Sequence, residues 1–350
     1  MPTDLSPEIV ALDAEQALIE WFCQHGSVGI GFSGGVDSAY LASVAFETLG
    51  PDRTLAIIGR SASYPEVQWR TARQVADDIG IPVLEIDTDE LNDERYVANP
   101  TNRCYFCKTE LWTKLAPLAK ERTLSVLIDG TNADDLLGHR PGAAAAREQG
   151  VRSPLAELGI TKAQIREWSR ARGLRTWDQP SSPCLSSRIP YGTAVTPERL
   201  RRIERAEAAL RAAGVRGDLR VRDHDDVGRV ELNAGDLRSL ENQEWTKAIA
   251  TSVIGAGFAR VAIDLAGFRS GSLNVLGSSD DLPSYPVAKE PGDLSDAMKS
   301  LGASGDVEAR GPIAILRVAS RDGLVAIRRK LVAAARARGY MTVCLELSPT

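Results

Sequence analysis

The sequence contains no apolar run that approaches the roughly 20 residues of a membrane-spanning helix. It has no excess of positive charge either, because 42 Lys and Arg stand against 47 Asp and Glu and give a formal net charge of -5. Proteins that bind nucleic acid present basic surfaces, so the composition argues against a nucleic-acid partner. Residues 1–15 carry acids and no basic segment, so we expect no signal peptide, no membrane partner and a cytoplasmic location.

Cysteine is scarce and odd in number, since the chain has five and shows no predicted export signal. A disulfide framework is therefore not expected. Cys23 and Cys344 lie in apolar stretches, which predicts plain core thiols. Cys104, Cys107 and Cys184 lie in motif-like surroundings, where ligation or sulfur chemistry is the better interpretation.

The most informative stretch is Ser33-Gly34-Gly35-Val36-Asp37-Ser38, which lies between an apolar run, 28–32, and a helix predicted over 39–49. A strand, a glycine-bearing turn and a helix form the arrangement in which backbone N–H groups bind phosphate. Adjacent glycines let the backbone approach an anion, and the two serine hydroxyls can bind it. The Lys of the Walker sequence is missing, so this is a different kind of phosphate loop. A plain tight turn is disfavoured because the whole hexapeptide and its placement agree.

Strands and helices alternate along the first half of the chain. Strands are predicted over 55–58, 82–86 and 124–128, and helices over 6–25, 65–79 and 109–120. This alternation predicts an α/β fold with a parallel sheet covered on both faces. Ligands bind beyond the carboxyl ends of such strands, so the turns at 59–63 and 129–135 are expected to complete a nucleotide site. The second turn also fits a simple turn with self-bonded Asn and Asp side chains.

The composition and the predicted elements divide the chain into four parts. Residues 1–195 are the α/β domain, 196–277 a smaller α+β domain, 278–311 a linker rich in Gly, Ser, Pro and Asp, and 312–350 a C-terminal strand-helix-strand (βαβ-like) extension. The extension is too small to be stable alone, so it should pack on the body or on a second subunit. We find no internal repeat in the sequence.

Two further features carry chemistry. Three prolines within residues 180–190 exclude a regular helix around Cys184 and predict an ordered loop that carries one thiol. In two strands predicted over 218–223 and 229–233, apolar residues alternate with charged ones: Arg220, Arg222, Arg229 and Glu231. Paired guanidinium groups suit a phosphate or a carboxylate. A solvated strand face is the alternative.

Together these motifs resemble the LarE family, the ATP-dependent sulfur transferases of nickel-pincer cofactor synthesis, within the PP-loop ATP pyrophosphatase superfamily. The likeness covers roughly residues 10–277. Its motifs are the phosphate loop, 130–135, 139–142, 152–155, 267–274 and, most particular to the family, the loop 177–192 around Cys184. The resemblance implies that ATP and Mg2+ adenylate a carboxylate of pyridinium-3,5-biscarboxylic acid mononucleotide, and that sulfur then displaces AMP to give a thiocarboxylate.

The resemblance also implies residue roles. The loop residues Ser33, Gly34, Gly35 and Ser38 would hold pyrophosphate, with Asp37 near Mg2+. The remaining contacts to the nucleotide would come from Arg60, Ser61, Gly130, Thr131, Asn132, Asp134 and Arg140. The strand residues Arg220, Arg222 and Glu231 would bind the substrate phosphate and assist at the site. Cys184 would carry or ligate the sulfur.

The sequence Cys104-Tyr105-Phe106-Cys107 adds two thiols to that of Cys184. Some relatives with three such cysteines hold a 4Fe-4S cluster whose open iron carries an extra sulfide, so the resemblance implies this cofactor. Four alternatives stay open. They are a sacrificial Cys184 that becomes dehydroalanine, as in single-cysteine members, a zinc knuckle that still needs a fourth ligand, a redox dithiol, and unrelated core thiols.

Other functional classes remain as alternatives: a PP-loop tRNA thiolase or another adenylating amidotransferase or ligase, and a degenerate nucleotide-binding protein. The acidic balance and the lack of a recognisable RNA-binding module count against the first. The presence of Asp37, Ser38 and Cys184 counts against the last. The resemblance further implies a homo-oligomer and hand-over of the product to the nickel-inserting enzyme of the pathway.

Overall fold

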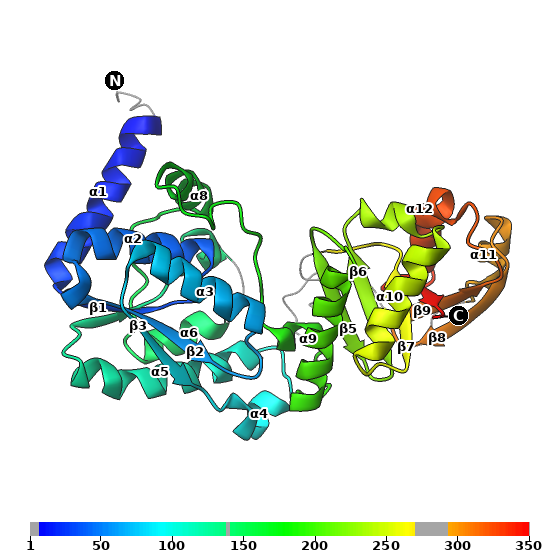
Figure 1. Cartoon of the computed structure of the whole chain (residues 1–350), viewed down its shortest axis with the longest axis horizontal. Coiled ribbons are helices and arrows are strands. Elements are labelled where there is room, and N and C mark those ends of the chain that lie inside the picture. Colours follow the sequence, from blue (N-terminus) through cyan, green and yellow to red (C-terminus); the bar gives the residue numbers. More distant parts are fainter. Residues whose placement is uncertain (1–6, 138–140, 270–292, 350) are drawn as a thin grey trace. The chain divides into compact units, whose positions relative to one another are not determined.

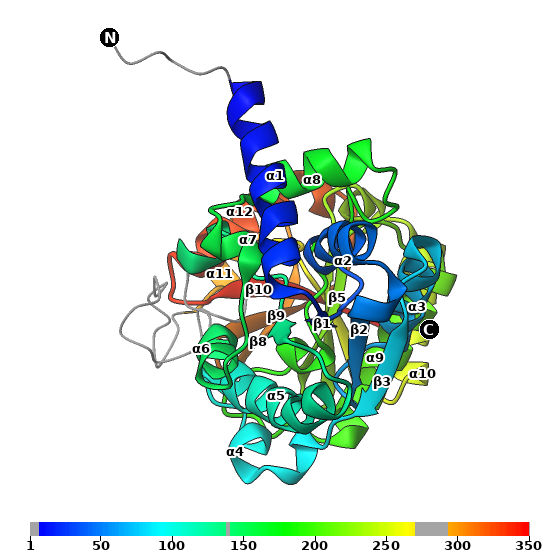
Figure 2. The ribbon, with the colours of Figure 1, turned by 90° about the vertical axis from the view of Figure 1, so that its left-hand side faces the viewer.

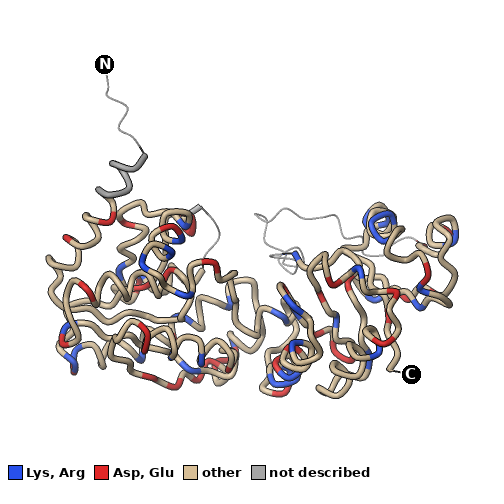
Figure 3. The backbone as a smooth tube through the Cα atoms, turned by 45° about the horizontal axis from the view of Figure 1, so that its top comes forward, with Lys and Arg blue, Asp and Glu red and all other residues tan. Residues whose placement is uncertain are grey.

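The computed structural model describes residues 7–137, 141–269 and 293–349, which form two compact units. The first contains the chain up to Val97 together with Asn102–Cys184, and the second contains Ala98–Thr101 and the chain from Leu185 onward. Basic and acidic residues are interspersed along both units (Figure 3). Among the described helices, none has the length and apolar character that crossing a membrane would require.

The first unit is a parallel sheet with helices on both faces (Figure 1). Its described strands are β1 (Val28–Gly31), β2 (Thr54–Arg60), β3 (Val83–Asp87) and β4 (Val126–Ile128). They lie in the order β3-β2-β1-β4, and every neighbouring pair is parallel. The helices are α1 (Pro7–His25), α2 (Val36–Leu49), α3 (Glu66–Ile79), α4 (Glu94–Val97), α5 (Arg103–Glu121), α6 (Pro141–Glu148), α7 (Pro154–Glu157) and α8 (Lys162–Ala171). The predicted α/β class with a parallel sheet is confirmed.

Strand β1 is covered by helices on both faces of this sheet. Val28 and Ile30 are fully buried in a core that α1, α2, α3 and α8 complete. The other face packs against α5 and α6, as Figure 2 shows. A side chain at Gly31 would lie 2.6 Å from the ring of Trp112 in α5, so glycine there lets this helix approach the strand. Helices therefore pack on both sides of β1 where the phosphate loop begins.

The second unit is built from two structural repeats that the sequence did not reveal. The first is α9 (Pro197–Ala212), β5 (Leu219–His224), β6 (Val227–Leu232), α10 (Gln243–Gly255) and β7 (Arg260–Asp264). The second is α11 (Ser295–Ser300), β8 (Gly305–Arg310), β9 (Ile313–Val318), α12 (Leu324–Arg336) and β10 (Thr342–Leu347). In each repeat the first two strands are antiparallel and the second and third parallel.

The two repeats meet in one sheet with the order β5-β6-β7-β10-β9-β8 among its described strands. At its centre β7 pairs antiparallel with β10, and the pair Cys344 with Asp264 has its mirror in Glu346 with Ala262. The register therefore has a pseudo-two-fold axis between β7 and β10. The C-terminal extension and β8, which precedes it, together supply half of this sheet.

The predicted linker over 278–311 is wrong in its second half. Residues 278–292 lie outside the described part, but α11 and β8 occupy 295–300 and 305–310. Polar composition misled the prediction, because Glu308 and Arg310 of β8 are only partly exposed and form ion pairs with other segments. The strand, helix and strand predicted beyond residue 312 are confirmed as β9, α12 and β10.

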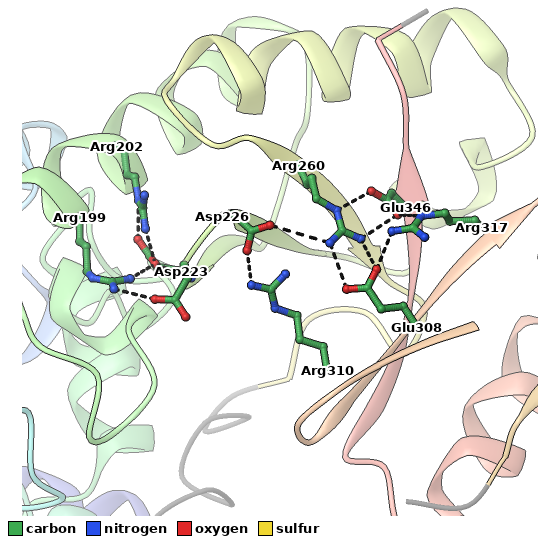
Figure 4. Close-up of polar contacts among 10 residues, drawn as sticks. Arg199, Arg202, Asp223, Asp226, Arg260, Glu308, Arg310, Arg317 and Glu346 are labelled. Atoms are coloured by element: carbon green, nitrogen blue, oxygen red, sulfur yellow. Dashed lines mark hydrogen bonds and ion pairs between the residues drawn. The ribbon is translucent and has the colours of Figure 1, made fainter. Parts of the chain in front are cut away.

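Helices cover one face of this sheet, with α9 packed on β5, α10 on β7 and α12 on β10. The opposite face of β5 and β6 carries the alternating charged residues. Arg229 and Glu231 are 0% exposed there, so the alternative of a solvated strand face is wrong. The ion pairs of Arg260 with Glu308 and of Arg310 with Asp226 join the edge strand β8 to β7 and to the β5–β6 turn (Figure 4). The sheet is therefore curled around its charged face.

Candidate active site

The phosphate loop lies between β1 and α2, as its sequence predicts. Gly34 has a φ of +69°, and a side chain there would collide with Ala72 of α3. The Oγ atoms of Ser33 and Ser38 lie 3.2 Å apart, and the Ser38 hydroxyl donates to the Gly35 carbonyl at 3.1 Å. The loop therefore presents the N-terminus of a 14-residue helix and its free N–H groups to any anion above it.

Asp37, in the first turn of α2, is the point where three segments meet. Asn132 donates its Nδ2 to Oδ1 of Asp37 at 3.2 Å, and Lys162 pairs through Nζ with Oδ2. Asp134 accepts the backbone N–H of Lys162 at 2.6 Å. The turn after β4 and the start of α8 are thus joined to the phosphate loop, and Asp37 already neutralises one cation.

Lys162 is a candidate site residue that the sequence analysis missed, because it lines this site and pairs with Asp37. The sequence marked it only as the first residue after the N-cap Thr161, whose capping box with Gln164 is present. Its position on Asp37 depends on where α8 begins relative to β1, more than 120 residues earlier. An ammonium group at this place suits the phosphates of a nucleotide.

A cavity of about 430 Å³ opens above the phosphate loop. This is the size of a small-molecule site. Among the predicted site residues, its walls contain Ser33, Gly34, Gly35, Asp37, Ser61, Cys104, Cys107 and Cys184, and they also contain Lys162. The other predicted residues of this region are not part of that lining: Ser38, Gly130, Thr131, Asn132 and Asp134. Asn132 still supports the loop through its hydrogen bond to Asp37, and Gly130 packs closely against the backbone of Ser38.

Arg60 also lies outside that lining. Its guanidinium group pairs with Glu85 at 3.7 Å and Glu66 at 3.9 Å, and it lies over the ring of Trp69. Arg140, predicted to contact the nucleotide, falls outside the described residues. Within the second strand's turn, Ser61 reaches the pocket and its hydroxyl bonds that of Ser63 at 2.9 Å.

The three motif cysteines share the wall of this one cavity. The helix predicted from 109 begins earlier, at Arg103, so Cys104 and Cys107 lie one turn apart on the same side of α5. Desolvation and then the charge of Cys184 raise the pKa of the Cys104 thiol. Burial and then the charge of Glu90 raise the pKa of Cys107. These thiols are therefore protonated unless a metal ion or a neighbouring cation draws the proton away.

Three thiols are a suitable donor set for iron or zinc. Within the described ranges, however, no three His, Cys, Asp or Glu side chains stand in an arrangement that could hold a metal ion. The donor type suits a cluster, but the described geometry does not itself show a site for one. Of the other two cysteines, Cys344 is buried as predicted, whereas Cys23 is exposed, because Phe22 beside it takes the buried face of α1.

The segment that leads to Cys184 is held by side chains from two helices. Arg166 of α8 donates to the carbonyl oxygens of Trp177 and Gln179 at 2.8 and 2.9 Å. Gln68 of α3 donates its Nε2 to the carbonyl oxygen of Ser182 at 2.7 Å. These bonds fix a proline-rich loop that forms no regular secondary structure of its own before residue 185.

The predicted residues Arg220, Arg222 and Glu231 lie in the second unit, on the charged face of β5 and β6. Arg222 binds Glu231 with its Nη2 at 2.8 Å. Burial, and after it the charges of Arg188 and Arg222, lower the pKa of Arg220 to about 10. Crowded guanidinium groups of this kind favour an anion as a third partner. Arg188, which the sequence analysis did not select, holds Glu207 with two bonds of 3.0 Å.

Comparison with known proteins agrees with this geometry. The sequence model of the NAD synthase family matches residues 21–99, which include the phosphate loop. An uncharacterised protein of Synechocystis sp. is 43% identical over 245 residues, 70% of this chain and 91% of that protein. The pyridinium-3,5-bisthiocarboxylic acid mononucleotide synthase of Lactiplantibacillus plantarum, a LarE protein, is 31% identical over 71% of this chain and 88% of its own. The chain belongs to the LarE family.

Membership in the LarE family places the chain among the PP-loop enzymes, which use ATP with Mg2+. The NMN synthetase of Francisella tularensis is a more distant structural neighbour, 20% identical, with a TM-score of 0.41 over 51% of this chain and 76% of that one. The matches to the Synechocystis and Lactiplantibacillus plantarum proteins leave nearly a third of this chain outside them but only about a tenth of each relative. This chain is therefore longer than these relatives.

Proposed function

We propose that the protein is an ATP-dependent sulfurtransferase that adenylates the carboxylates of pyridinium-3,5-biscarboxylic acid mononucleotide and converts them to thiocarboxylates in nickel-pincer cofactor biosynthesis. One observation carries the proposal: Cys184 lines the same cavity as the phosphate loop. A nucleophilic thiol next to a pyrophosphate site is what attack on an acyl-adenylate requires. The product in the name of the Lactiplantibacillus plantarum relative, a pyridinium-3,5-bisthiocarboxylic acid mononucleotide, suggests the chemical identity of the acyl group.

Adenylation is assigned to the phosphate loop and its neighbours. The carboxylate attacks the α-phosphorus of ATP, and the negative charge that develops on pyrophosphate meets the loop N–H groups and the ammonium group of Lys162. Asp37 is assigned to Mg2+, so Lys162 would move from this carboxylate to the phosphates when ATP and the metal bind. A carboxylate is a poor electrophile until AMP is attached as a leaving group, which explains why ATP is spent.

Cys184 is proposed as the residue that carries the sulfur to the adenylate. A thiolate is the strongest nucleophile that the side chains of this cavity can offer to an acyl-adenylate. Cys104, Cys107 and Cys184 are also the residues that would hold a 4Fe-4S cluster, which supplies an open iron for an additional sulfide. Arg220 and Arg222 are assigned to the phosphate of the mononucleotide, because their positive charges already crowd one another.

The decisive experiment follows pyrophosphate and thiocarboxylate separately in Cys184→Ala. We expect pyrophosphate release to persist while thiocarboxylate formation is lost, because the phosphate loop does not depend on the thiol. Loss of both products would show a structural thiol and overturn the proposal. Cys23→Ala is the matched control, since Cys23 is an exposed thiol on α1 and should leave both products unchanged.

The sulfur source is read from the same reaction. Whole-protein mass spectrometry of the wild type after turnover will show the loss of hydrogen sulfide from Cys184 if the protein gives up its own sulfur. An unchanged mass, with iron bound to anaerobically purified protein and repeated turnover on added sulfide, will show delivery from a cluster. Iron binding must then depend on Cys104, Cys107 and Cys184 together.

A further inference from the structure

A buried chain of charges runs beneath Arg222 and ends in the C-terminal repeat. Arg222 pairs with Glu231 at 2.8 Å, and the other oxygen of Glu231 pairs with Arg229 at 2.8 Å. Arg229 faces Asp264 at 3.5 Å, and the Thr342 hydroxyl of β10 donates to Asp264 at 2.7 Å. All but Arg222 are 0% exposed. We call these five residues the buried charge chain.

Each member of the buried charge chain depends on its neighbours, because a charge away from water is costly unless it is paired. Burial raises the pKa of Asp264, and Arg229 and the Thr342 hydroxyl act in the opposite direction. Besides Thr342, Oδ1 of Asp264 accepts the backbone N–H of Ala266 at 2.8 Å. In the described structure Oδ2 of Asp264 has no hydrogen-bond donor. Arg229 and Arg269 face that oxygen at 3.5 Å, and the Thr342 hydroxyl fixes the position of the other oxygen, Oδ1.

The pseudo-two-fold axis gives this chain a counterpart. Val227 pairs with Arg260, and Ile313, at the same place in the second repeat, pairs with Thr342. Arg260 and Thr342 are thus equivalent positions, as are Asp264 and Glu346. The hydrogen bond from Thr342 to Asp264 corresponds to the ion pair of Arg260 with Glu346, which measures 2.7 Å.

The counterpart cluster, drawn in Figure 4, consists of Arg260, Glu308, Arg317 and Glu346. Its Glu308 and Arg317 replace Arg222 and Glu231 with the charges exchanged. Its side chains are 18–50% exposed, and both arginines are held by Glu308 and Glu346. It therefore offers no crowded guanidinium groups to an anion. Of the two clusters, only that of the first repeat has crowded guanidinium groups. The buried charge chain beneath them includes one residue of the second repeat, Thr342.

We propose that the C-terminal repeat is a working part of the substrate-phosphate site and that Thr342 is a positioning residue, which acts through Asp264 and Arg229 to hold the pair of Arg222 and Glu231. This inference rests on the proposed function, in which Arg222 binds the phosphate of the mononucleotide. It assigns a role to a segment that lies beyond the part of the sequence resembling the LarE family.

The test compares Thr342→Val with Thr342→Ser in the full-length protein. Valine keeps the shape of threonine and removes the hydroxyl, whereas serine keeps the hydroxyl. For Thr342→Val we expect KM for the pyridinium mononucleotide to rise roughly three- to tenfold, the scale of one net hydrogen bond, with KM for ATP unchanged. Thr342→Ser should stay close to the wild type in both constants.

Glu308→Gln is the matched control, because it breaks the counterpart cluster on the same sheet. It should lower the melting temperature and leave both KM values unchanged. An unchanged KM in Thr342→Val, an equal rise in Thr342→Ser, or an equal rise in Glu308→Gln overturns the positioning role while the wild type remains active. A wild type that neither binds nor converts the mononucleotide overturns the proposed function and this inference with it.

Discussion

Replacement of Gly34 by alanine should destabilise the first unit, because two separate costs fall on this position. A φ of +69° is a left-handed conformation that costs an alanine roughly 1–2 kcal/mol. Its Cβ would also lie 2.6 Å from the Cβ of Ala72 and closer still to the Ala72 Cα, an overpacking that costs about 1–3 kcal/mol. We expect a loss of roughly 2–5 kcal/mol of unfolding free energy, measured by chemical denaturation followed by circular dichroism.

The neighbouring glycine provides the control. Gly35 has a φ of -77°, and a Cβ there would meet nothing nearer than the Ser33 Oγ at 3.5 Å. Gly35→Ala should therefore change stability by less than about 1 kcal/mol. In the double variant Gly34→Ala with Ala72→Gly, only a small part of the loss should return, since the backbone of residue 72 still blocks the new Cβ. Equal stability of Gly34→Ala and Gly35→Ala, or full recovery in the double variant, would refute the reasoning.

Three further outcomes follow from the contacts of the site. Lys162→Met should reduce kcat/KM for ATP roughly hundredfold, because a cation next to the phosphates is lost. Lys162→Arg should retain part of the wild-type kcat/KM, and equal rates of pyrophosphate release in the two variants would contradict this role. Arg166→Ala should lower thiocarboxylate formation roughly fivefold or more without lowering pyrophosphate release, because the loop before Cys184 loses two hydrogen bonds. The control Arg170→Ala, which removes stacking on Trp177, should affect neither product. Burial, and after it the charge of Arg229, lowers the pKa of His224. Below about pH 6.5 the unfolded chain therefore takes up a proton that the folded chain does not. The free energy of unfolding should then fall by up to about 1.4 kcal/mol for each unit that the pH decreases. Denaturation curves between pH 7 and 5 should show a flatter slope in His224→Phe, and equal slopes would rule out this group as the cause.

Local sequence patterns were sufficient to predict the structure wherever residues close together in the sequence determine it. The hexapeptide from Ser33 to Ser38 predicts its own strand, turn and helix, because glycine conformations and helix N-termini act within a few residues. The alternation of Arg220, Arg222, Arg229 and Glu231 with apolar residues likewise predicts strands with one charged face. Whether that face is solvent-exposed or buried depends on how the whole sheet curls, and a short stretch of sequence does not determine this.

The sequence by itself determined the α/β class, the phosphate loop and the LarE resemblance, since these are written in contiguous motifs. Only the tertiary structure brought Cys184 to the cavity wall with Cys104 and Cys107, and Lys162 to Asp37, because those contacts join segments that are far apart along the chain. The repeat in the second unit was also invisible in sequence. Its equivalent positions carry exchanged charges, and backbone hydrogen bonds fix strand order and register whichever side chains stand there.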